Sequence, residues 1–280
     1  MNKWNMIVNV GRCENCNNCV IAARDEYSGN DFPGYAAPAP AVGDPLIRIK
    51  RRVQGGGHMV ETTYLPVMCN HCDDAPCVQA GRGAVTKRAD GIVLIDPLKA
   101  KGRKDIVKSC PYGAIVWNEE SQLPQTWIFD AHLLDQGWGA PRCQQSCPTG
   151  VFETVRVDDQ TMARRARDEG LTGLRAELGT KPRVWYRDID RWRNCFIGGS
   201  VSAPVAGRME CLVDAEAVLW QGGSRLAETR SDAFGDFKFA GLHKDSGSYR
   251  VEIRHPLGRA ERVCELGESQ YLGEFVLSES

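Results

Sequence analysis

The spacing of the cysteines constrains this chain more than any other feature. Twelve of its 280 residues are cysteine. Nine of them lie in the first 147 residues: Cys13, Cys16, Cys19, Cys69, Cys72, Cys77, Cys110, Cys143 and Cys147. Small secreted proteins use many cysteines as a disulfide framework, but this chain is long and we expect no signal peptide in its polar first residues. Thiols grouped at short fixed spacings therefore predict metal sites rather than disulfides.

The first group has the spacing of an iron–sulfur protein. Cys13-x-x-Cys16-x-x-Cys19 matches the opening of the bacterial ferredoxin run, in which three thiolates from one tight loop bind three irons of a four-iron cluster. The fourth thiolate comes from a distant cysteine that is followed by proline. Cys110 and Cys147 are both followed by proline and then by small residues, so they read as an internal repeat.

A second trio completes the set of ligands. Two trios and two Cys-Pro segments supply eight thiolates, which is the number that two [4Fe-4S] clusters need. Zinc is the alternative, but zinc sites use pairs of cysteines, and we favour iron–sulfur. We expect one cluster on Cys13, Cys16, Cys19 and Cys147, and the other on Cys69, Cys72, Cys77 and Cys110. Cys143 is left over.

The rest of the chain indicates an α+β protein of three parts. Residues 1–155 form the cysteine-rich region, which we expect to be a ferredoxin-like iron–sulfur domain with loops rich in glycine and proline. Residues 156–195 predict a linker with a helix that begins at Asp158 or Asp159 and stops near Gly170. A second short helix is expected over 171–178 and a strand over 184–186.

Residues 196–280 have the pattern of an all-β domain. Short alternating runs punctuated by glycine predict a sandwich of immunoglobulin or transthyretin type. The expected strands cover residues 215–221, 225–230, 234–239, 248–254, 260–266 and 271–277.

Charge and hydropathy exclude some functions. Lys and Arg number 35 and Asp and Glu 36, which gives a formal net charge of −1. Nucleic-acid binding needs clustered basic charge, so we expect no nucleic-acid partner. No run of residues approaches the roughly 18 apolar residues of a membrane helix, and we expect a cytoplasmic protein without a membrane partner.

Beyond the spacing, several segments resemble a known family. The order of the cysteine blocks is similar to that of the iron–sulfur subunits of the dimethyl sulfoxide reductase family of molybdenum enzymes. Within it, the chain most resembles the small (β) subunits of pyrogallol–phloroglucinol transhydroxylase and resorcinol hydroxylase. The segments that carry the likeness are CENCNNC at 13–19, FPGY at 32–35, DGIVLIDP at 90–97, CPYG at 110–113, AHLLD at 131–135, GTKPRV at 179–184 and DAFGDFKF at 232–239.

The resemblance also implies a loss. Those small subunits look built for three clusters, and the positions of the middle one correspond here to Ala23, Trp127, Asp130 and Cys143. Only Cys143 can supply a thiolate, so we expect the middle cluster to be absent and 127–129 to fill its space. Asp130 as an oxygen ligand is the alternative.

The family implies that the chain is a non-catalytic subunit of a larger enzyme. We expect a large partner subunit that holds molybdenum bis-molybdopterin guanine dinucleotide and acts on polyhydroxylated aromatics, in a heterodimer or a larger assembly. One alternative is a mainly structural subunit whose clusters crosslink the fold. Another is the electron-transfer subunit of a respiratory molybdenum reductase.

Some single residues are lesser candidates. Cys195, Cys211 and Cys264 are expected to be buried as small apolar side chains. His71 lies inside the second trio, where a hydrogen bond to a cluster sulfide would raise the reduction potential. The alternative for His71 is a ring that faces solvent or bonds to the backbone. A basic group at 48 and 50–52 is expected in a loop-rich stretch and could dock a partner.

Overall fold

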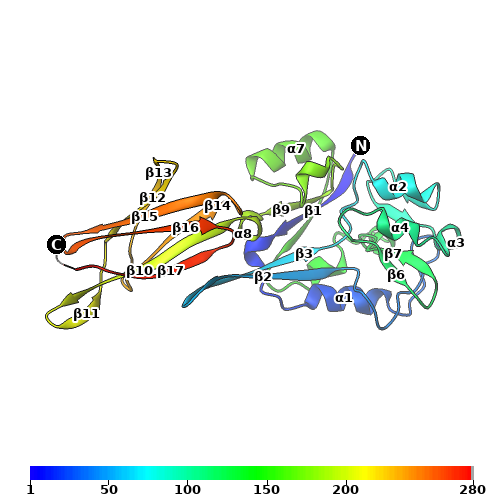
Figure 1. Ribbon diagram of the computed structural model, residues 1–280. Helices are drawn as coiled ribbons and strands as arrows, with labels where there is room; N and C mark the ends of the chain where they lie inside the picture. The colour runs from blue at the N-terminus through cyan, green and yellow to red at the C-terminus, as the bar shows by residue number, and fades with distance from the viewer. Residues whose placement is uncertain (279–280) are drawn as a thin grey trace. The chain divides into compact units, whose positions relative to one another are not determined.

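The computed structural model describes residues 1–278, and these form two compact units (Figure 1). The first unit combines residues 1–51 with 64–189, and the second combines 52–63 with the chain from residue 190 onward. Compactness thus groups residues 156–189 of the expected linker with the cysteine-rich region and 190–195 with the second unit. The domain boundaries expected near 155 and 195 stay predictions. No helix among the described residues is long and apolar enough to cross a membrane.

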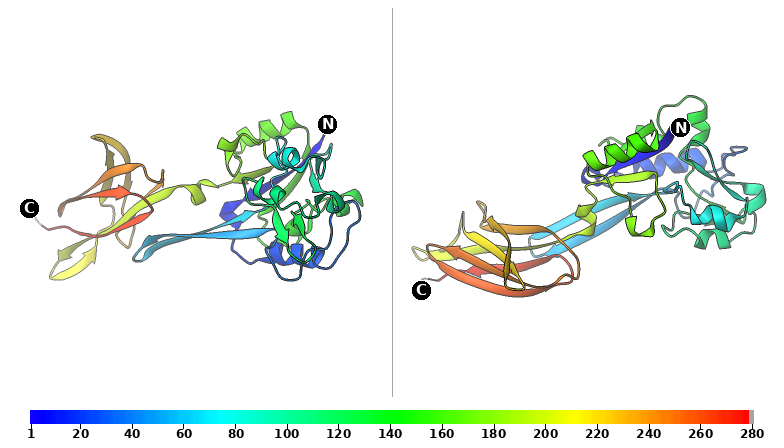
Figure 2. Two further views of the ribbon diagram at one scale, coloured as in Figure 1. Left: turned by 45° about the vertical axis from the view of Figure 1, so that its right-hand side comes forward. Right: turned by 90° about the horizontal axis from the view of Figure 1, so that it is seen from above.

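A three-stranded sheet supports the first unit. β1 (Lys3–Asn9) lies at its centre, antiparallel to β8 (Phe152–Val157) and parallel to β9 (Val184–Arg187). Helix α7 (Asp159–Asp168) packs on this sheet, where its Met162 and Ala166 meet Ile7 of β1 (Figure 2). The sheet brings the two ends of the cysteine-rich region together, because β1 precedes the first trio and β8 follows Cys147.

The predicted helix and strand of the linker are confirmed, but the second helix is wrong. The Asp158 side chain caps α7 by accepting a hydrogen bond from the backbone N–H of Thr161 at 2.8 Å. After α7, Thr172 exchanges two backbone hydrogen bonds with Tyr186 of β9, which holds the chain extended. Only one 3₁₀ turn, η2 (Ala176–Leu178), remains of the expected helix.

Short elements connected by loops make up the cysteine-rich region. Apolar side chains that include Val85, Ile95 and Ile106 form a core in which Cys72 and Cys77 are themselves members. Its elements are η1 (Val10–Arg12), α1 (Asn18–Tyr27), α2 (Pro76–Gly81), β4 (Val85–Lys87), β5 (Val93–Ile95), α3 (Pro97–Ala100), α4 (Asp105–Lys108), β6 (Val116–Asn118), β7 (Leu123–Gln125), α5 (Ala131–Asp135) and α6 (Arg142–Gln145).

A long hairpin was not expected from the sequence. β2 (Arg48–Gly56) pairs with β3 (Met59–Val67) in a two-stranded sheet, and Gly57 turns the chain with a φ of +56°. The stretch that contains the basic residues Arg48 and Arg52 is therefore a strand rather than a loop. The strand was missed because the consecutive charged residues at 50–52 interrupt the alternation of apolar and polar side chains that predicts a strand.

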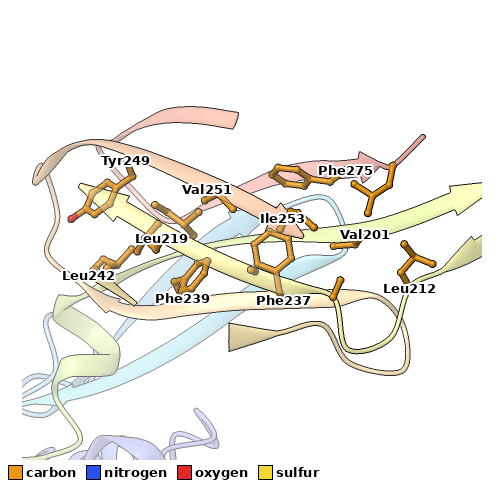
Figure 3. Close-up of a cluster of buried hydrophobic side chains, with 14 of the residues drawn as sticks. Val201, Leu212, Leu219, Phe237, Phe239, Leu242, Tyr249, Val251, Ile253 and Phe275 are labelled. Atoms are coloured by element: carbon orange, nitrogen blue, oxygen red, sulfur yellow. The ribbon is translucent and has the colours of Figure 1, made fainter. Parts of the chain in front are cut away.

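The second unit contains two four-stranded sheets that face each other across an apolar core (Figure 3). One sheet comprises β10 (Cys195–Val205), β11 (Arg208–Cys211), β14 (Asp236–Leu242) and β17 (Gln270–Val276), and the other β12 (Glu216–Gln221), β13 (Ser224–Arg230), β15 (Gly247–His255) and β16 (Gly258–Leu266). Phe237, Phe239 and Phe275 from the first sheet pack against Leu219 and Val251 from the second.

The six expected strands of this unit are present with small shifts. The largest shift is in β14, which begins at Asp236 instead of residue 234 and ends at Leu242 instead of residue 239. Asp232 explains the later start, because its side chain accepts hydrogen bonds from the N–H groups of Phe234 and Asp236 and so forms a turn. Strands β10 and β11 were not predicted from the sequence, since glycine and serine interrupt the apolar pattern of β10.

Candidate iron–sulfur sites

Four cysteines from three segments line one cavity in the first unit. Cys69 and Cys72 lie in the loop that follows β3, Cys77 is in the first turn of α2, and Cys110 follows α4. Pro76 occupies the first turn of α2, where a missing N–H costs nothing. These are the four cysteines that spacing assigned to the second cluster, and the fold brings them together.

The other four expected ligands also lie near one another. Cys13 and Cys16 are in the loop between η1 and α1, Cys19 is in the first turn of α1, and Cys147 follows α6. Burial raises the pKa of Cys19 to about 12, and the neighbouring Cys13 and Cys147 add to the rise by charge repulsion. Cys16 is exposed and Cys13 and Cys147 are half-buried, so this site is nearer to solvent than the second.

The two Cys-Pro segments repeat the same local geometry. The N–H of Ala114 donates to Cys110 Sγ, and the N–H of Val151 donates to Cys147 Sγ, each at 3.4 Å. In both segments a glycine comes just before the donor, with a φ of +63° at position 113 and +65° at position 150. A side chain is rarely tolerated at such a φ, which explains the glycine in each repeat.

The openings of the two trios are similar as well. Asn15 and His71 each lie directly before the second cysteine of their trio, with φ values of +56° and +44°. The N–H of His71 donates to Cys69 Sγ at 3.5 Å, and the N–H of Asn15 makes the corresponding bond to Cys13. N–H donors of this kind favour the thiolate over the thiol, which is the form that binds iron.

The thiols of the second site are suited to binding positively charged metal. Burial raises the pKa of Cys69 strongly and that of Cys77 to about 11, and repulsion from Cys110 contributes to both. Such thiols lose their protons when a metal supplies positive charge, and metal binding releases those protons. Buried convergent thiols with backbone N–H donors therefore fit an iron–sulfur cluster.

The segment at 180–183 clamps the second trio, which spacing alone did not show. Its backbone pairs with the cysteine loop through Arg183 N–H to the carbonyl of Asn70 at 2.8 Å and Asp73 N–H to the carbonyl of Lys181 at 2.9 Å. The hydroxyl of Thr180 lies 2.6 Å from that of Tyr112, two residues beyond Cys110. The clamp therefore contacts two of the three segments that supply thiols to this site, the loop of Cys69 and Cys72 and the segment that follows Cys110.

A network of charges lies under the same loop. Arg183, whose side chain is 5% exposed, pairs with Asp73, and Lys87 Nζ lies 2.8 Å from Asp73 Oδ1. Burial acts to raise the pKa of Asp73, but hydrogen bonds from Arg183 and Lys87 outweigh it and lower the pKa to about 2. Lys87 also donates to the carbonyls of His71 and Cys72, at 3.0 and 2.9 Å. Lys87 and Arg183 thus hold the loop that presents the second trio.

Comparison with known proteins shows the family of this chain. A family model described as a 4Fe-4S dicluster domain matches residues 60–157. The pyrogallol hydroxytransferase small subunit of Pelobacter acidigallici is 41% identical over 90% of this chain and 91% of its own. The tetrathionate reductase of Salmonella typhimurium has a subunit that is 30% identical over 78% of this chain and 80% of its own. The chain belongs to the iron–sulfur subunits of the dimethyl sulfoxide reductase family.

In this iron–sulfur subunit a carboxylate occupies the region expected for a middle cluster. Asp130 is 1% exposed. Its Oδ1 accepts hydrogen bonds from the Tyr27 hydroxyl and from Trp127 Nε1 at 3.1 Å, and its Oδ2 accepts one from the Arg142 N–H at 2.7 Å. Burial raises the pKa of Asp130, and these three hydrogen bonds oppose the rise. Both carboxylate oxygens are therefore engaged by protein donors.

Aromatic rings fill the space beside this carboxylate. Trp127 and Phe129 are fully buried and stacked, with ring centroids 4.8 Å apart. Cys143 is also buried, and burial together with the charges of Asp130 and Cys19 raises its pKa well above the usual value. Cys143 is thus the one thiol of the expected middle set, and both the Asp130 carboxylate and the first trio are close enough to influence it.

The lesser candidates of the iron–sulfur subunit have mixed outcomes. Cys195 is buried as expected, but Cys211 is exposed and Cys264 is half-buried, so burial of all three was wrong. Cys211 ends the fully exposed edge strand β11, which explains its exposure. In residues 1–278, no three His, Cys, Asp or Glu side chains lie close enough together to hold a single metal ion.

Proposed function

We propose that this subunit carries two [4Fe-4S] clusters, one on Cys13, Cys16, Cys19 and Cys147 and one on Cys69, Cys72, Cys77 and Cys110. The observation that carries the proposal is the convergence of the second four thiols on one cavity, with N–H donors to Cys69 and Cys110. The bound clusters would supply one-electron redox chemistry. The protein supplies the thiolates, the N–H donors and the burial that tune it.

We further propose that the middle cluster of related subunits is absent here. Support comes from the buried Asp130, whose oxygens bind Tyr27, Trp127 and Arg142, and from the stacked Trp127 and Phe129. The rate of electron tunnelling falls exponentially with distance, so loss of the middle cluster would slow electron transfer between the two outer clusters. A reaction without net electron exchange tolerates that loss best.

The partner would be a large catalytic subunit that holds molybdenum bis-molybdopterin guanine dinucleotide. The relative named pyrogallol hydroxytransferase small subunit supports a heterodimer that hydroxylates, or transfers hydroxyl groups between, polyhydroxylated aromatics. We place the complex in the cytoplasm, where thiols destined for iron stay reduced. The sandwich, proposed to be of immunoglobulin or transthyretin type, would serve this subunit as an accessory domain.

Iron and acid-labile sulfide analysis tests the cluster count. Two clusters predict about eight irons and about eight sulfides per chain, whereas three clusters predict about twelve. Zinc without sulfide would overturn the iron–sulfur assignment itself. Copurification with a molybdenum-containing chain tests the partner, and isolation of the subunit with a membrane quinol-oxidising chain would instead support a respiratory role.

A mainly structural role is the second candidate. Cys72 and Cys77 are members of the apolar core of the cysteine-rich region, so a cluster there would also crosslink α2 to the loops around it. Midpoint potentials distinguish the two functions. Clusters whose potentials are too negative for reduction in the working complex would be crosslinks, whereas clusters that change oxidation state during turnover would carry electrons.

A further inference from the structure

His71 is held in a single tautomer beside the second set of cysteines. Its side chain is buried, and its Nδ1 accepts a hydrogen bond from the N–H of Val93 at 3.0 Å. An N–H donor at Nδ1 requires a free lone pair on that nitrogen, so the ring proton resides on Nε2. Cys69 Sγ lies 3.9 Å from the same Nδ1, and as a thiolate it has no proton to offer that nitrogen.

The Nε2–H group has no hydrogen-bond partner among the described residues. Leaving a buried donor unpaired is costly, so proteins rarely do so without a reason. His71 is one of the residues that line the cavity shared by Cys69, Cys72, Cys77 and Cys110. An iron–sulfur cluster bound in that cavity would provide the hydrogen-bond acceptor for Nε2–H that the protein itself does not.

Aromatic rings also border His71. Trp127 and Phe129 meet it edge to face, with ring centroids 5.6 and 5.5 Å away. An N–H group directed at an aromatic face is a weak interaction. These rings exclude water from His71 and leave a sulfur atom in the cavity as the strong acceptor.

We propose that His71 Nε2–H donates a hydrogen bond to a sulfur atom of the second cluster and raises its reduction potential. This inference rests on the proposed cluster assignment. The equivalent position of the first trio is Asn15, which is half-buried and nearer to solvent. At this position the second cluster would gain a donor from a buried ring, which stabilises its reduced, more negative state.

Pulsed electron paramagnetic resonance on the complex reduced with dithionite tests the contact without any mutation. The subunit contains five histidines. Protein labelled with nitrogen-15 histidine should show a nitrogen coupling to the reduced second cluster, and His71→Phe should remove it. Redox titration of the same samples should show a lower midpoint potential for the second cluster in His71→Phe. His71→Gln, which keeps a donor, should restore part of the difference, and Asn15→Ala should leave the second cluster unchanged.

Three outcomes would overturn the proposal. Wild-type protein with intact clusters and no histidine nitrogen coupling would show that Nε2–H faces the aromatic rings instead. An unchanged potential in a His71→Phe sample that still holds about eight irons would remove the tuning role. Protein without iron would overturn the proposed function and this inference together, and the iron analysis distinguishes that case from the other two.

Discussion

Arg183 and Asp73 form an ion pair although they lie 110 positions apart in the chain. Arg183 Nε is 2.8 Å from Asp73 Oδ1, and the same guanidinium also binds Asp159 at the start of α7. Arg183 directly precedes β9, so its side chain joins the loop of the second trio, through Asp73, to the start of α7, through Asp159. It connects a cysteine site to the sheet that supports the first unit.

Arg183→Met should weaken the second site. Removing one partner of a largely buried pair leaves Asp73 with lysine partners alone, at a cost of about 2–4 kcal/mol once the partial exposure of Asp73 is considered. The midpoint of thermal unfolding and the iron content should both fall, with the iron loss confined to the second cluster. Lys181→Met is the matched control, because Lys181 is 71% exposed and its ion pair with Asp74 should contribute little in solvent.

The penalty of Arg183→Met should not depend on pH near neutrality. The pKa of Asp73 is lowered to about 2 in the folded protein from 3.8. A carboxyl whose pKa is lowered on folding stabilises the folded protein at every pH above its unfolded pKa. That stabilisation is lost as the pH falls through the folded pKa of about 2. Denaturant unfolding of both proteins should give a constant difference from about pH 5 to about pH 8. A difference that changes across that range would assign the effect to another group.

Cys147→Ser and Cys143→Ser should have different effects. Cys147→Ser removes a proposed thiolate of the first cluster, so iron should fall from about eight toward about four per chain. Cys143→Ser changes a buried thiol that we assign to no cluster, so the iron content should stay near about eight. Iron analysis of the two purified variants checks this. Loss of iron in Cys143→Ser alone would show that the pairing with Cys147 is wrong.

Asp130→Ala should destabilise the first unit. The change leaves the Tyr27 hydroxyl, Trp127 Nε1–H and Arg142 N–H without their acceptor, at a cost of about 2–4 kcal/mol. Asp130→Asn keeps an oxygen for Tyr27 and Trp127 and should cost less. Midpoints of thermal unfolding should fall in the order wild type, Asn, Ala. Equal midpoints for wild type and Ala would mean that this carboxylate does not anchor the region.

Phe237→Ala should destabilise the sandwich without changing the iron content. Phe237 is 2% exposed in the core between the two sheets, and deleting a buried phenylalanine costs about 3–5 kcal/mol. Phe234→Ala removes a ring that is 76% exposed and should change stability by less than about 0.5 kcal/mol. Calorimetry with iron analysis checks both. Iron loss in Phe237→Ala would show that cluster binding depends on the sandwich.

Local chemistry was readable from the chain alone. The spacing of Cys13, Cys16 and Cys19 predicted an iron–sulfur loop because a tight turn can direct three thiols at one cluster. Asp158 indicated the start of α7, since a carboxylate caps the free N–H groups of a first turn. Alternating apolar residues predicted most strands of the sandwich, because successive side chains point to opposite faces of a sheet.

Interactions between distant segments were decided only by the tertiary structure. The pairing of Thr172 with Tyr186 and the ion pair of Arg183 with Asp73 each join segments whose own sequence does not indicate the partner. The free Nε2–H of His71 belongs to the same class, since it became visible only when Val93 was seen to occupy Nδ1. Spacing and periodicity act within a few residues of chain, whereas burial and partner choice depend on which surfaces the whole fold brings together.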